Sequence, residues 1–330
     1  MRVSNSNEFA DLHAVSNFIL IGLCIIAGFV LKRLRVLPDD AHKGINIWVL
    51  YLAVPAVALK YIPTIHWSND LLLPALMPVI VWTGSWLTFK LYSLWRPLDR
   101  ATRTALTLVA GLGNTSFLGF PLVSAYYGEQ ALPIAVISDQ VTFMLMATVG
   151  SMMAINTRPH PTFPEGEGLT ANPIIIVMRK VLLFPPFIGF IAALVLPHFI
   201  DFAPALPVLD KIASTLVPLA LFSVGMQLNL EVWVEDIPLL GLSLGYKLLI
   251  APALILVIML VLNMKGLPAE ISLFEAAMAP MITAGVLATQ YDLNPRLANL
   301  VVGIGILFSF LTTGIWFLIV SIAGGALAHC

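Results

Sequence analysis

The sequence has little charge for its length. Only 11% of its 330 residues are Asp, Glu, Lys or Arg, whereas 59% are hydrophobic and the mean hydropathy is +0.94. A soluble domain carries about 25% charged residues, so this chain has too few to coat a water-soluble globule of its size. The composition argues against a soluble enzyme, a disordered regulator and a secreted disulfide scaffold. It predicts a polytopic membrane protein.

Cysteine, net charge and enzyme motifs are scarce as well. The two cysteines are Cys24, in an apolar run, and Cys330, and neither position favours a disulfide or a metal site. The formal net charge of −1 gives no positive field for nucleic acid. No HExxH, GxSxG or GxxxxGKS/T motif occurs. We therefore expect no catalytic residue, no cofactor, no metal and no nucleic-acid partner.

Apolar runs between polar, proline or glycine borders predict ten membrane-spanning helices. They are expected near residues 14–32, 44–62, 70–94, 103–127, 131–155, 173–197, 207–228, 237–262, 270–291 and 296–325. Segment 156–172 is rich in proline, glycine and acid and is predicted to be a linker. The chain then divides into five helices in 1–155, the linker 156–172, and five helices in 173–330.

Lysine and arginine are unevenly divided between alternate predicted loops, which predicts orientation. One set of loops with its flanks holds Lys32, Arg33, Arg35, Lys43, Lys90, Arg96, Arg100, Arg103, Arg158, Arg179, Lys180 and Arg296; the other holds only Arg2, Lys60, Lys211 and Lys265. The richer set is predicted to face the cytoplasm, so both termini lie outside and the linker inside. Short loops and the lack of a targeting presequence favour a bacterial inner membrane.

The fourth and ninth predicted helices are both interrupted by helix breakers. The fourth contains Asn114, Thr115, Ser116, Gly119 and Pro121 within AGLGNTSFLGFPLVSAYYG; the ninth contains Pro280, Thr283 and Gly285 within AAMAPMITAGVLATQ. An odd number of helices in each half predicts two inverted repeats. Interrupted helices at matching places in two inverted halves indicate a transporter binding site at the membrane midplane. Half-helix N-termini after 119–121 and 283–285 would attract an anion. Kinks with close helix packing are the alternative.

Asp139 is predicted to lie in mid-helix beside Gln140, with no basic residue in the same helix. A carboxylate inside a membrane is costly unless it serves a function. Asp139 could carry a coupling proton or cation, or it could be a hydrogen-bonded structural residue. Lys247 and Glu275 could pair with each other or extend to the interface.

The stretch ALTLVAGLGNTSFLGFPLVSAYYGEQALPIAVISDQ (105–140) resembles the helix 4 to helix 5 region of the auxin efflux carrier family, in its short prokaryotic form. The resemblance implies an inverted-repeat fold, similar also to bile-acid sodium symporters, in which helices 4 and 9 cross at their breaks. By motif, Asn114 and Pro121 would sit at the first crossing. Pro280 would sit at the second, with Met281, Ile282 and Thr283 where the family has an Asn beside its proline.

The resemblance further implies secondary transport of organic anions, either auxin-like weak acids or dicarboxylates such as malate and malonate. The leading prediction is an all-α integral membrane carrier of small carboxylates, coupled to H+ or Na+ and working by alternating access. A cation/proton antiporter is the alternative, although it would normally use more than one buried carboxylate and Asp139 is the only one well inside a predicted helix. A membrane ligand sensor is the third. The expected partners are the anion, the coupling ion and the lipid bilayer, and a homodimer is allowed for.

Overall fold

A computed structural model describes residues 3–38, 40–157, 178–179, 182–201, 203–228 and 234–328. Most of the predicted linker, from 158 to 172, and the start of the sixth predicted helix lie outside these ranges. Helices are the only extended secondary structure in the described ranges, which confirms the predicted all-α class. The only β-type pairing there is a single bridge between Gly113 and Pro280.

The first half of the chain forms helices joined in places by π-helical turns. Its elements are α1 (Val3–Arg33), α2 (Ala41–Trp48), η1 (Val49–Ala53), α3 (Val54–Tyr61), α4 (Leu72–Trp95), α5 (Arg100–Gly111), η4 (Thr115–Gly119), α6 (Phe120–Tyr127), α7 (Leu132–Leu145), η6 (Met146–Gly150) and α8 (Ser151–Thr157). Here η1, η4 and η6 are the π-helical turns.

The second half also forms helices within the described ranges. Its described elements are α10 (Pro185–Val195), α11 (Leu206–Ser214), α12 (Leu216–Gln227), α13 (Ile237–Gly245), the π-helical turn η9 (Tyr246–Ile250), α14 (Ala251–Val261), α15 (Leu267–Ala276), α16 (Ile282–Gln290) and α17 (Pro295–Ala328). Every one of the ten predicted ranges therefore contains helix.

Within the described residues, six continuous helical stretches are long and apolar enough to cross a membrane. They are Ala41–Thr64, Asn69–Trp95, Glu129–Thr157, Leu206–Gln227, Ile237–Val261 and Pro295–Ile322. The fourth and ninth predicted helices are not among them because each is divided into two short pieces. The pieces α5 and α6 have 12 and 8 residues, and α15 and α16 have 10 and 9.

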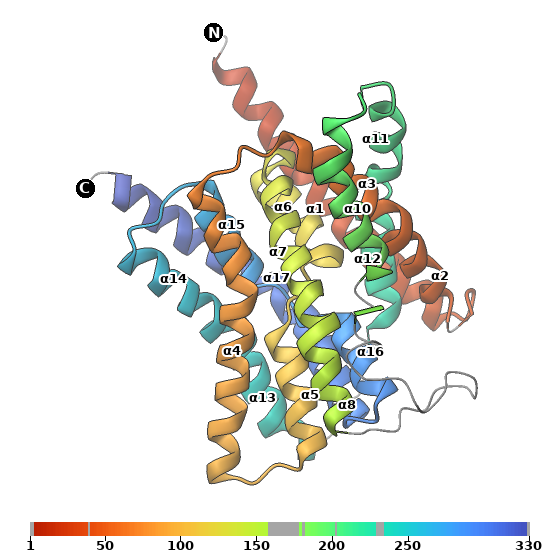
Figure 1. Cartoon of the computed structure of the whole chain (residues 1–330), viewed down its shortest axis with the longest axis vertical. Helices are drawn as coiled ribbons and strands as arrows, with labels where there is room; N and C mark the ends of the chain where they lie inside the picture. Colours follow the sequence, from red (N-terminus) through yellow and green to blue (C-terminus); the bar gives the residue numbers. More distant parts are fainter. Residues whose placement is uncertain are drawn as a thin grey trace.

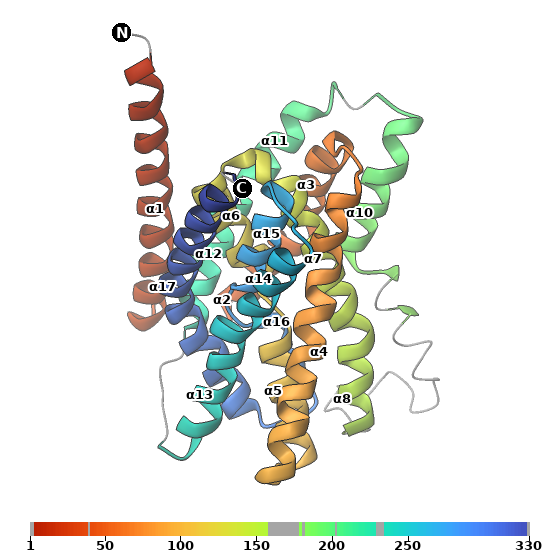
Figure 2. The same ribbon diagram turned by 90° about the vertical axis from the view of Figure 1, so that its left-hand side faces the viewer.

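The two halves of the chain pack against each other along several helix pairs. α1 lies along α12, α10 lies against α3, and α4 contacts α15 (Figures 1 and 2). The α1–α12 contact is close because Gly28 faces the Phe222 carbonyl and Gly225 faces the Ile25 carbonyl. Small residues at such crossings let helix backbones approach within a membrane.

The broken helices run through the middle of the molecule. In Figure 1, α6 and α15 lie in the upper half, while α5 and α16 lie in the lower half. The beginning of α1 and the end of α17 lie toward the upper end, whereas the turn between α4 and α5 lies at the lower end (Figures 1 and 2). The two breaks are thus placed at mid-height, among helices from both halves.

Candidate site at the paired helix breaks

Each broken helix has a short extended segment between its two pieces. α5 ends at Gly111, Leu112 is extended, and helix resumes as η4 at Thr115. α15 ends at Ala276 and α16 begins at Ile282, preceded by the extended residue Met281. The second pieces therefore begin at Thr115 and Ile282. The predicted start after 119–121 agrees with the beginning of α6 at Phe120, which the π-helical turn η4 precedes. The predicted start after 283–285 is too late, because α16 begins at Ile282.

The two extended segments pair with each other. The Asn114 backbone N–H donates to the Ala279 carbonyl at 2.8 Å, and the Met281 N–H donates to the Leu112 carbonyl at 3.0 Å. Gly113 and Pro280 form the antiparallel bridge between them. Unwound backbone at membrane depth needs internal partners, and here each break supplies part of what the other lacks.

Beside the first break, Thr115 ties the break to α7. The Thr115 hydroxyl donates to Asp139 Oδ1 at 2.6 Å, and Ser116 also lies near this carboxylate. Asp139 is 0% exposed and Asn114 is 3% exposed. Asp139 Oδ2 and Asn114 Nδ2 have no hydrogen-bond partner among the described residues. Buried polar atoms are nearly always paired, so these two are available to a ligand.

A second acid and a lysine lie at the same place. Glu275, in the last turn of α15, is 0% exposed, and neither of its carboxylate oxygens has a partner among the described residues. Lys247, on η9, is 1% exposed and donates to the Ala276 carbonyl at 3.0 Å. Glu275 has Lys247 and Asp139 as its charged neighbours. We call Asn114, Thr115, Asp139, Lys247 and Glu275 the break cluster.

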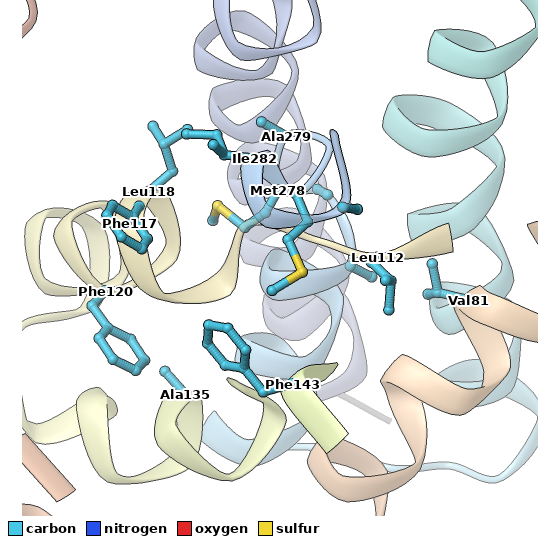
Figure 3. Packing of buried hydrophobic residues seen from close by; sticks show 14 of the residues in the cluster. Val81, Leu112, Phe117, Leu118, Phe120, Ala135, Phe143, Met278, Ala279 and Ile282 are labelled. Carbon is cyan, nitrogen blue, oxygen red and sulfur yellow. The ribbon is translucent and has the colours of Figure 1, made fainter. Parts of the chain in front are cut away.

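The surroundings of the break cluster are apolar. Figure 3 shows Leu112 and Phe117 from the first broken helix beside Met278 and Ile282 from the second, with Phe143 of α7 below them. All five are buried. Such surroundings strengthen electrostatic interactions within the cluster and make uncompensated charge costly.

The remaining predicted residues of the first break have different positions. Gly119 lies directly against Glu275: a Cβ added to Gly119 would be 2.7 Å from one Glu275 carboxylate oxygen and 2.8 Å from the other. Pro121 is buried near the start of α6, where proline is tolerated. Because the extended segment precedes Pro121 by several residues, this proline does not itself break the helix.

The predicted residues of the second break lie partly in the paired segments and partly in α16. Pro280 and Met281 belong to the paired segments, Ile282 begins α16, and Thr283 follows it as a half-buried residue. Gly285 instead packs against α17, where an added Cβ would be 3.0 Å from the Asn299 side chain. For Gly285, helix packing explains the residue type.

Gln140 is buried with its Nε2 unpartnered among the described residues. It lines a small apolar cavity of about 10 Å³ together with Phe143 and Phe184. Gln140 is therefore not part of the break cluster.

Sequence reasoning considered Glu275 and Lys247 but did not place them in the site. The prediction that Asp139 is the only acid well inside a helix is wrong, since Glu275 is equally buried. Lys247 does not extend to the interface. The sequence signal for both residues was a charge within a long apolar run. How close Lys247 lies to Glu275 depends on how η9, between α13 and α14, packs beside the second break, and the sequence does not specify that packing. Among the described residues, no three His, Cys, Asp or Glu side chains form a metal cluster.

Comparison with known proteins identifies the family of this chain. A model of the membrane transport protein family matches residues 13–317. The chain belongs to this family. The predicted resemblance to auxin efflux carriers is thereby confirmed, and the protein is a membrane transporter rather than an enzyme.

Several named relatives of this membrane transport protein are similar over most of its length. An uncharacterized transporter of Methanothermobacter thermautotrophicus is 25% identical over 295 residues, covering 88% of this chain and 93% of the relative. An uncharacterized transporter of Methanocaldococcus jannaschii is 24% identical, covering 90% and 96%. A protein of Rhizobium meliloti named "Putative malonate transporter" is 26% identical, covering 89% and 92%.

Proposed function

We propose that this protein is a secondary carrier of small organic anions and binds a carboxylate at the paired helix breaks. The observation that carries the proposal is the break cluster itself: a buried amide and a buried lysine beside two facing extended segments. Lys247 Nζ has one hydrogen-bond acceptor in Ala276 and Asn114 Nδ2 has none, so both have donors left for carboxylate oxygens. The Rhizobium relative's name supports a dicarboxylate such as malonate.

Asp139 is the proposed coupling residue. Its Oδ1 accepts from Thr115 at the start of η4, so a proton or Na+ taken up at Oδ2 would act directly on the first break. Carbonyl oxygens freed at a break are suitable additional ligands for Na+. In this proposal the ten helices form two inverted repeats, and alternating access occurs around the breaks.

For localisation we propose a bacterial inner membrane with both termini outside. The positive charge of alternate loops supports this orientation. The beginning of α1 and the end of α17 also lie toward one end of the fold, opposite the α4–α5 turn.

Counterflow in proteoliposomes tests the proposed function. Vesicles loaded with unlabelled malonate should accumulate trace labelled malonate above protein-free vesicles without any imposed gradient. Imposed pH and Na+ gradients then identify the coupling ion. Folded protein that gives no counterflow with malonate, malate or an aryl-acetate would refute carboxylate transport.

Two variants locate the site. Asn114→Ala and Asp139→Asn should each reduce counterflow at least tenfold, roughly the effect of one hydrogen bond to a charged group. Asn69→Ala and Asp70→Asn are matched controls, since both residues are exposed beside α4, and they should transport normally. If Asn114→Ala and Asp139→Asn both leave transport intact, the site is misplaced.

The second candidate function is cation/proton antiport, which is favoured by the finding of two buried carboxylates, Asp139 and Glu275. Lys247 would neutralise one of them in the resting state. The two functions separate in one experiment: an antiporter dissipates an imposed pH gradient when Na+ or K+ is added and gives no malonate counterflow. The carrier gives malonate counterflow without added Na+ or K+ gradients.

A further inference from the structure

A cavity of about 240 Å³ lies away from the break cluster, between α4, α5 and α8. Its lining includes Trp86 and Lys90 of α4, Arg100, Arg103 and Thr107 of α5, and Asn156 of α8. Drug-sized ligands occupy pockets of roughly 300–1,000 Å³, so this volume suits a smaller molecule. The cavity opens at the end of the fold that holds the α4–α5 turn.

Among the described residues, three cationic side chains and no acid line this cavity. None of Lys90, Arg100 and Arg103 forms an ion pair within the part of the chain that the structure describes. Lys90 Nζ instead lies 4.6 Å from the centre of the Trp86 ring. Cations gathered in one hollow repel one another and attract an anion.

The nearest acid in the sequence serves another purpose. Asp99 caps α5 by accepting a hydrogen bond from the Thr102 backbone N–H at 2.9 Å. Burial raises the pKa of Asp99, but hydrogen bonds from Thr102 outweigh this and leave the pKa below its usual value. Asp99 therefore remains ionised as a cap and does not line the cavity.

The cavity follows α5 toward the first break. At 1.5 Å per residue, Arg100 and Thr107 are about 10 Å apart along the helix axis. Gly111, where α5 ends, is one further turn beyond Thr107. Polar groups also continue along this wall, since Ser85 of α4 donates to the Thr107 carbonyl at 3.1 Å.

We propose that this cavity is a second, peripheral anion site, which binds a small dicarboxylate through Lys90, Arg100 and Arg103 before it reaches the breaks or after it leaves them. Arg103 is the central residue, because it is half-buried in the hollow and its guanidinium can hold a carboxylate through two hydrogen bonds. The role as a station for the carried anion rests on the proposed function; the binding itself does not.

Trp86 provides a reporter for the test. Malonate is titrated into the purified full-length protein in detergent, and the signal from Trp86 is the difference between the wild type and Trp86→Phe. The wild type should show a saturable change that chloride at the same ionic strength does not produce. Arg103→Gln should weaken malonate binding at least tenfold.

The matched control is Arg96→Gln, which removes the same charge from an exposed residue of the α4–α5 turn that does not line the cavity. It should leave malonate binding unchanged. Equal binding by Arg103→Gln and wild type, or equal weakening by Arg96→Gln, would overturn the proposal.

Phosphate-bearing lipids present a similar charge, and a second arm separates them. The titration is repeated with phosphatidylglycerol or phosphatidylcholine added to the detergent micelles. A Trp86 response to phosphatidylglycerol without a response to malonate would make the cavity a lipid headgroup site and refute the proposal. A saturable malonate response in a protein without malonate counterflow would keep the cavity site and refute the proposed function instead.

Discussion

Lys247→Met is the substitution whose effect the structure predicts most sharply. Lys247 is buried at the break cluster, where Glu275 has no hydrogen-bond partner among the described residues. With the lysine removed, Glu275 has only the like-charged Asp139 as a charged neighbour. Lys247 and Glu275 are charged neighbours without a direct ion pair among the described contacts. The loss should therefore be smaller than the roughly 3–5 kcal/mol that removing one partner of a directly contacting buried pair costs.

The double variant K247M/E275Q should be more stable than K247M alone. Replacing both members of a buried pair by neutral groups is often nearly neutral, and here Lys247 loses only its bond to the Ala276 carbonyl. The two substitutions should therefore couple by at least about 1 kcal/mol in a double-mutant cycle.

The assay measures unfolding of the purified protein in one fixed detergent. The folded fraction is recorded as denaturant is added. The wild type, K247M, E275Q and K247M/E275Q complete the cycle. Lys211→Met is the matched control, since Lys211 is exposed on α11 and its loss should change stability little. An additive cycle, with the double variant as unstable as the sum of the singles, would refute the charge pair.

The remaining predictions concern two close approaches. Gly225→Ala should destabilise the protein by about 1–3 kcal/mol, because the added Cβ would clash with the Ile25 carbonyl of α1. Gly22→Ala is the control in the same unfolding assay, since a Cβ at Gly22 meets nothing within 4 Å. Equal stability of both variants would contradict the packing of α1 against α12. Gly119→Ala should reduce malonate counterflow while changing the free energy of unfolding little, because the added Cβ displaces the Glu275 carboxylate. Unchanged counterflow would show that transport does not depend on the position of Glu275.

Much of the helical fold follows from the sequence, because apolar runs in a chain of low charge have few alternatives to helix. All ten predicted ranges contain helix, and glycine and proline at 111–121 and 280–285 correctly indicated which two are interrupted. At the second break, α16 begins earlier than predicted, and at the first break the π-helical turn η4 precedes α6. A proline signals a constraint on the backbone, but pairing between the breaks decided where each chain leaves the helix.

The composition of the candidate site could be predicted only in part. Asn114, Thr115 and Asp139 are close in sequence, so one motif brings all three to attention. Lys247 and Glu275 come from separate helices of the other half, and their proximity to the first break depends on tertiary packing. The cationic cavity was missed for the same reason: its arginines were interpreted only as orientation signals.

Different contacts close the two sides of the break cluster. Toward the upper end in Figure 1, Tyr126 and Tyr127 of α6 pack against Phe274 of α15 and Phe317 of α17, with ring centres 4.9–5.2 Å apart. This layer links both broken helices to α17.

Toward the lower end, α5 packs closely against α4 between the cavity and the first break. A Cβ on Gly111 would be 3.1 Å from Ser85 Cβ and 3.3 Å from the Trp82 ring. We expect a shift of α4 away from Gly111 to join the cationic cavity to the break cluster, whereas opening the upper side would separate four packed aromatic rings. In the proposed alternating access, we therefore expect opening to begin on the side of the cavity, where Arg103 lies.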